Sequence, residues 1–103
     1  MNATTATAPV TAPTAPAVTS VEEADALIAE SRRRIDAIDD RIIGLIQERM
    51  AVSAVIQETR ITTGGRRVHL SREMEVLAHF RDALGKPGTN LAMTLLEVCR
   101  GRI

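Results

Sequence analysis

The segment SVEEADALIAESRRRIDAIDDRIIGLIQERMAVSAVIQETRIT, residues 20–62, decides the fold. It holds no proline and one glycine, Gly44. Seven of its apolar residues step by three, four or seven: Ile28, Ile35, Ile38, Ile42, Leu45, Val52 and Ile56. This spacing predicts one helix of about 40 residues, roughly 60 Å long at 1.5 Å per residue. Ser20 is the expected N-cap, followed by Glu22 and Glu23 in the first turn.

The apolar face of so long a helix needs a cover. Only about 40 residues follow it, too few to shield its whole length. A second copy of the same helix solves the problem, so we expect an intertwined homodimer in which the long helices pack together.

The remainder of the chain predicts two short helices. Residues 62–70 form a loop that the paired Gly64 and Gly65 interrupt. Ser71 is the expected cap of a second helix, which Gly85, Pro87 and Gly88 end. One face of this helix carries apolar side chains, namely Met74, Leu77, Phe80 and Leu84. Thr89 or Asn90 is the expected cap of a third helix, whose apolar stripe is Leu91, Leu95, Val98 and Cys99.

Composition agrees with an all-α fold. The 103 residues include no Trp, no Tyr and a single Phe, although 45% of them are hydrophobic. Sheets favour aromatic and β-branched residues, so aliphatic packing between helices is expected. The formal net charge of zero argues against bulk attraction to nucleic acid or to an anionic membrane. One cysteine excludes a disulfide framework within the chain and a multi-cysteine metal site.

The first 20 residues differ from the rest. They consist of Ala, Thr, Pro, Val, Asn, Ser and Met, with three prolines close together. Such a stretch cannot bury a core, and it has neither the basic region nor the apolar run of a secretory signal. We therefore expect a disordered tail at residues 1–20, a folded domain at residues 21–103, and a cytoplasmic protein.

The basic residues are almost all arginine. The chain has 13 basic residues, of which Lys86 is the only lysine. Codon bias explains such a ratio, and so does a use of guanidinium groups as anion ligands. Arg49 falls on the apolar seam, where a charge needs a partner. The partner is either an acidic residue such as Glu48 or Asp39 of a second chain, or an anionic ligand.

Two further cations stand near Arg49 in the expected fold. Arg60 lies eleven residues on, about three turns and roughly 16 Å along the same helix face. It is either a residue that satisfies the helix dipole or a ligand for the same anion. Arg72 lies in the first turn of the second helix, where the helix dipole disfavours a cation. The dipole favours its neighbour Glu73 there, as a simple capping charge.

These residues in this order resemble the all-helical class of chorismate mutases. The resemblance runs over residues 27–103 and rests on Arg32, Asp39, Arg49 and Arg60 in register, on the Ser-Arg-Glu-Met run at 71–74, and on Leu91-Ala92-Met93 with Arg100-Gly101-Arg102, which are similar to the short bacterial subclass.

The resemblance implies a dimeric enzyme that rearranges chorismate, a dicarboxylate, to prephenate without cofactor, metal or covalent intermediate. Such an enzyme holds the substrate in its compact form and stabilises charge on the breaking ether oxygen. By the same resemblance, Arg32 enters from the partner protomer and binds carboxylates together with Arg49. Arg60 contacts a carboxylate and the ether oxygen, Arg72 adds a cation, and Glu73 accepts from the ring hydroxyl.

Two positions depart from the family pattern. His69 stands where the best-known members carry an aspartate, so it is expected to line the substrate site without a catalytic role. The third helix lacks the glutamine that many members direct at the ether oxygen; the nearest candidates are Glu97, Cys99 and Arg100. A pericyclic step needs no nucleophile or base, so Cys99 and His69 are expected to be dispensable for chemistry.

Two other functions stay open beside the mutase. An isochorismate pyruvate lyase uses the same scaffold but has a lysine in its active-site loop, where this chain has Arg66 and Arg67. A non-catalytic helical interaction module would use the arginines in structural ion pairs. The Arg-Gly-Arg ending resembles that of short bacterial mutases that a partner, DAHP synthase, activates, so the resemblance implies such a partner here. The missing glutamine and a loop loosened by its two glycines suit this expectation.

Overall fold

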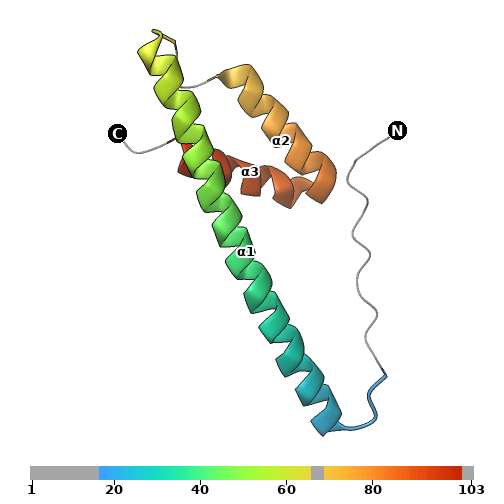
Figure 1. Cartoon of the computed structure of the whole chain (residues 1–103). Coiled ribbons are helices and arrows are strands. Elements are labelled where there is room, and N and C mark those ends of the chain that lie inside the picture. Colours follow the sequence, from blue (N-terminus) through green and yellow to red (C-terminus); the bar gives the residue numbers. More distant parts are fainter. Residues whose placement is uncertain (1–16, 66–68, 101–103) are drawn as a thin grey trace, which may run out of the picture. The chain divides into compact units, whose positions relative to one another are not determined.

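The computed structural model describes residues 17–65 and 69–100, and these form three helices and no strand. The helices are α1 (Val21–Thr62), α2 (Leu70–Leu84) and α3 (Lys86–Cys99), as Figure 1 shows. The chain divides into two compact units, residues 1–44 and 45–103, and α1 contributes to both. The prediction of an all-α fold with one long and two short helices is confirmed. Most of the predicted tail lies outside the described residues.

The start of α1 follows the prediction. The Ser20 hydroxyl accepts a hydrogen bond from the Glu23 amide at 3.0 Å, so Ser20 caps the helix. The Glu23 carboxylate in turn accepts from the Thr19 hydroxyl at 2.6 Å and from the Thr19 amide at 2.7 Å. These bonds, chiefly the one from the Thr19 side chain, favour the ionised form and lower the pKa of Glu23.

The glycine pair Gly64 and Gly65 forms the end of α1. Gly64 has a φ of 83°, and its amide donates to the Ile61 carbonyl at 3.1 Å. The Gly65 amide donates to the Arg60 carbonyl, which completes a Schellman cap. The two glycines therefore cap α1, which ends at Thr62, and the loosening of the loop that follows them stays a prediction. Residues 66–68 lie outside the described ranges.

The predicted caps of α2 and α3 are wrong by two to five residues. The N-cap of α2 is His69 in an extended conformation, not Ser71, whose hydroxyl lies 3.3 Å from His69 Nδ1 instead. Gly85, with a φ of 78°, ends α2 as predicted and also precedes α3. Pro87 and Gly88 fall inside the first turn of α3, so neither Thr89 nor Asn90 caps it. Proline is well tolerated in a first helical turn because no intrahelical donor is lost there.

The core of the second unit lies between α2 and α3. Its buried residues are Val76 of α2 and Gly88, Ala92, Leu95 and Cys99 of α3. Only Leu95 and Cys99 belong to the stripe predicted for α3, because small residues, not Leu91 and Val98, face α2. On α2, Leu77 and Phe80 are half-buried, whereas Met74 and Leu84 are exposed.

Helix α1 buries none of its side chains within this chain. Its seam residues remain between 45% and 62% exposed, and they are Ile28, Ile35, Ile38, Ile42, Leu45, Val52 and Ile56. The described part of the chain thus leaves the apolar face of α1 uncovered. In the same ranges, no helix is both long enough and apolar enough to cross a membrane.

Candidate active site

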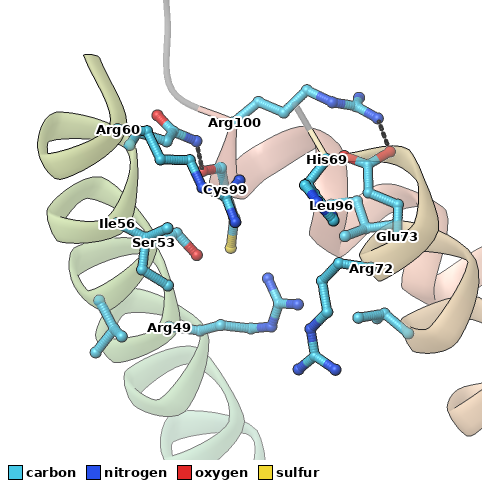
Figure 2. Close-up of a pocket in the computed structure, with 13 residues that line it drawn as sticks. Arg49, Ser53, Ile56, Arg60, His69, Arg72, Glu73, Leu96, Cys99 and Arg100 are labelled. Atoms are coloured by element: carbon cyan, nitrogen blue, oxygen red, sulfur yellow. Dashed lines mark hydrogen bonds and ion pairs between the residues drawn. The ribbon is translucent and has the colours of Figure 1, made fainter. Parts of the chain in front are cut away.

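A cavity of about 270 Å³ opens in the second unit, with walls from all three helices and from His69 before α2 (Figure 2). Helix α1 contributes six of the lining residues, namely Arg49, Val52, Ser53, Ile56, Gln57 and Arg60. The opposite walls hold His69, Arg72, Glu73 and Val76, with Leu96, Cys99 and Arg100. Five of the six predicted site residues therefore surround one cavity: Arg49, Arg60, His69, Arg72 and Glu73.

A polar stripe on α1 faces this cavity. Arg49, Ser53, Gln57 and Arg60 follow one another at steps of four, four and three residues, and each is half-buried while its neighbours on the helix are exposed. The predicted common face of Arg49 and Arg60 is thus confirmed. In Figure 2 the Arg49 side chain extends from α1 across the cavity toward Arg72 of α2.

The charges around the cavity are unequal. Four guanidinium groups, those of Arg49, Arg60, Arg72 and Arg100, face one carboxylate, that of Glu73. Within the described ranges, no ion pair engages Arg49 or Arg60, and neither Glu48 nor Asp39 of the same chain contacts Arg49. The cavity is consequently built to attract an anion, and guanidinium groups bind carboxylates in a bidentate manner.

Arg72 and Glu73 have partners that the sequence did not reveal. Arg72 pairs with Glu75 at 3.1 Å, which accounts for a cation in the first turn of α2, although both side chains are about two-thirds exposed and the pair is weak. Glu73 accepts a hydrogen bond from Arg100 Nη2 at 2.9 Å, and its side chain is only 21% exposed. Sequence spacing could not show this second pair, because the packing of α2 on α3 brings the two residues together.

Gln57 is a polar lining residue that sequence reasoning missed. Its Nε2 donates to the carbonyl oxygen of Cys99 at 2.9 Å and so joins α1 to the end of α3. The available signal was periodicity, since Ser53 and Gln57 continue the helical spacing that relates Arg49 to Arg60.

Arg32 is the predicted site residue that the structure does not bring to the cavity. It lies on α1 in the first unit, its side chain is exposed, and it is not among the residues that line the cavity of this chain. Its entry from a partner protomer stays a prediction. In the described part of the chain, no group of three or more His, Cys, Asp and Glu side chains could hold a metal ion.

Known proteins share this sequence and this fold. Residues 31–96, more than half of the chain, match the family described as chorismate mutase type II. An intracellular chorismate mutase of Mycolicibacterium smegmatis is 47% identical over 76 residues, which cover 74% of this chain and 73% of the relative. An intracellular chorismate mutase of Mycobacterium tuberculosis is 40% identical over 72 residues, or 70% of this chain and 68% of the relative.

A solved structure has the same arrangement of helices. It is a non-covalent complex of DAHP synthase and chorismate mutase from Corynebacterium glutamicum with a bound transition-state analogue. The match has a TM-score of 0.74 and 34% identity, and it covers 78% of this chain and 96% of the other. Together with the sequence matches, this likeness shows that the chain belongs to the chorismate mutase type II family.

Proposed function

We propose that the cavity of the second unit is the site at which this chain rearranges chorismate to prephenate. The observation that carries the proposal is the half-buried pair Arg49 and Arg60, which line one cavity from one helix face without an ion pair among the described residues. Half-buried cations left in this state suit a ligand that brings its own negative charge. Chorismate, with two carboxylates, is such a ligand.

The reaction needs restraint and electrostatic stabilisation. The bond rearrangement is intramolecular, so the protein has to hold the compact conformer of the substrate and stabilise negative charge that grows on the ether oxygen. Arg49 serves to bind a carboxylate, Arg60 to contact a carboxylate and the ether oxygen, and Arg72 to supply a further cation. Glu73 accepts from the ring hydroxyl, and His69 borders the site.

A second copy of the chain completes the site in this proposal. The exposed apolar seam of α1 supports a homodimer, because burial of such side chains stabilises by about 25 cal/mol per Å². Arg32 of one protomer then joins Arg49, Arg60, Arg72 and Glu73 of the other. The family and the named relatives support the mutase, and they do not support the lyase or the interaction module. The relatives carry the word intracellular in their names, which supports a location inside the cell.

Binding of a stable mimic tests the function. A bicyclic dicarboxylate that resembles the compact transition state should raise the melting temperature, since a ligand at 100 times its Kd stabilises by about 2.7 kcal/mol. The shift should vanish in Arg49→Met but persist in Arg81→Met, because Arg81 is exposed and does not line the cavity. Equal shifts in both variants would contradict the assignment of the site.

We further propose DAHP synthase as an activating partner. The support is the Corynebacterium glutamicum structure, in which a chorismate mutase of the same fold is in complex with that enzyme. A tenfold rise in the competent fraction of sites requires only about 1.4 kcal/mol from an interface. The cognate DAHP synthase should therefore raise the rate of the mutase. The assay is repeated with residues 100–103 deleted, which removes the Arg-Gly-Arg ending. An unchanged rate in the full-length mixture removes the partner.

A further inference from the structure

We propose that Gln57 is a positioning residue of this site, a role that rests on the proposed function. Gln57 donates a hydrogen bond to the backbone carbonyl of Cys99, the last residue of α3. Arg100, which follows Cys99, holds the carboxylate of Glu73, so Gln57 fixes that carboxylate through Arg100. We call Gln57, Cys99, Arg100 and Glu73 the α3 clamp.

The first link of the α3 clamp joins α1 to α3. The last carbonyls of a helix have no intrahelical donor, and Cys99, the final residue of α3, is only 6% exposed. Gln57 Nε2 satisfies its carbonyl at 2.9 Å from a half-buried position. Over residues 17–65 and 69–100, no other hydrogen bond connects α1 to α2 or α3. This single amide therefore sets where the end of α3 lies against α1.

The second link joins α3 to α2. Arg100 directly follows Cys99, continues the helical backbone as the C-cap, and donates from its own amide to the Glu97 carbonyl at 3.3 Å. Its Nη2 reaches Glu73 Oε1 at 2.9 Å. A displacement of the Cys99 carbonyl is thus transmitted to Arg100 and from there to Glu73. Both residues line the candidate site and also a second cavity, so their ion pair forms part of the walls of both.

The α3 clamp controls the separation of the α1 side of the site from its α2 side. Arg49 and Arg60 stand on α1, whereas Glu73 stands on α2, and the polar links between these sides pass through Gln57. A misplacement of about 1 Å at a reacting centre can lower a rate by a factor of about 100. The cations that bind carboxylates remain in place when Gln57 is lost, so catalysis should suffer more than substrate binding.

The primary test is Gln57→Met, which keeps the length of the side chain and removes the donor. We expect kcat to fall about tenfold and KM to change less than threefold, because binding energy from Arg49 and Arg60 is retained. The matched control is Gln47→Met, since Gln47 is an exposed glutamine of α1 that does not line the cavity. A kcat for Gln57→Met equal to that of the control overturns the proposal.

A pH series with Gln57→Glu gives a readout that loss of packing alone would not move. The introduced carboxyl can donate to the Cys99 carbonyl only when protonated. Its activity, divided by that of the wild type at the same pH, should therefore rise as pH falls, while the ratio for Gln57→Met stays flat. The other titratable and charged groups of the cavity are the same in every variant, and they are Arg49, Arg60, His69, Arg72, Glu73, Cys99 and Arg100. Dividing by the wild-type activity removes their contribution to the pH dependence. A flat ratio for Gln57→Glu contradicts the hydrogen bond as the cause.

A double-mutant cycle tests whether Gln57 acts through Arg100. If it does, Gln57→Met combined with Arg100→Met should be about as impaired as the worse single variant; multiplied losses would show independent action. The same cycle on thermal unfolding needs no substrate. A wild-type protein that fails to rearrange chorismate would refute the proposed function, and with it the effect on rate. A coupled cycle in unfolding would still show the α3 clamp, and additive melting shifts would remove it.

Discussion

Gly88 is the position at which one added methyl group should damage both the fold and the site. It is buried in the first turn of α3, where α3 crosses α2. A Cβ at this position would lie 2.8 Å from the Leu84 Cβ and closer still to the Phe80 carbonyl oxygen. Carbon atoms pack best at about 3.5–4.0 Å, so Gly88→Ala has to push the two helices apart by roughly 1 Å.

The expected loss follows from the two opposing effects of the substitution. Overpacking of a well-packed contact costs about 1–3 kcal/mol, and alanine returns up to about 1 kcal/mol of helix propensity. A net loss of about 1–2 kcal/mol should lower the melting temperature by about 5–15 °C for a domain of this size. Because Glu73 and Arg100 stand on the separated helices, kcat should fall as well, by about tenfold or more.

Gly44→Ala is the control for this prediction. Gly44 lies inside α1, and nothing in the described chain lies within 4 Å of a Cβ added there. The same substitution should therefore stabilise by about 0.5–1 kcal/mol. Circular dichroism melts and initial rates measure both variants. A Gly88→Ala protein that melts at or above the wild-type temperature would refute the close contact between α2 and α3.

Three further outcomes follow from the fold and the proposed site. Chains carrying Arg32→Ala and chains carrying Arg49→Ala, inactive alone, should recover about a quarter of wild-type activity when mixed, because half of the dimers then hold one intact site; no recovery contradicts the shared site. Thr19→Val should bring the lowered pKa of Glu23 back toward its ordinary value in a carboxyl NMR titration. The Glu23 contribution is present above the unfolded-state pKa and is lost as pH falls through the folded-state pKa, so acid should fray the start of α1. Gly64→Ala should cost about 1–2 kcal/mol in thermal unfolding, since its φ of 83° disfavours a side chain.

Periodicity made much of the fold predictable. The run of apolar residues from Ile28 to Ile56 and the capping pattern at Ser20 are local signals, and α1 begins and ends where they indicate. The starts of α2 and α3 were not predictable in this way. Both helices begin before the best capping side chain. For α3 the reason is its contact with α2, since Gly88 in its first turn packs against Phe80 and Leu84.

The site was predictable where its residues share one helix. Arg49 and Arg60 lie eleven residues apart on α1, and the helical repeat alone puts them on one face. Contacts between helices were beyond sequence reasoning, because they depend on how the helices pack. The pair of Glu73 with Arg100 spans 27 residues, and the bond from Gln57 to the Cys99 carbonyl spans 42. Moreover, every residue has a backbone carbonyl, so the sequence does not indicate which carbonyl accepts a bond from a side chain.

The central claim is a mutase site built on the arginines of α1. It is tested most directly by a comparison of the rates at which wild-type and Arg60→Met proteins convert chorismate to prephenate. Loss of chorismate and gain of prephenate are followed together by proton NMR, with Arg81→Met as the control for a lost surface cation. Wild-type and Arg81→Met proteins should turn over at similar rates. Arg60→Met should lose about 100-fold or more in kcat with a smaller change in KM, the loss expected for a donor to a developing oxyanion. A wild-type protein that leaves chorismate unchanged, or an Arg60→Met protein with an undiminished kcat, would contradict a mutase site built on the arginines of α1.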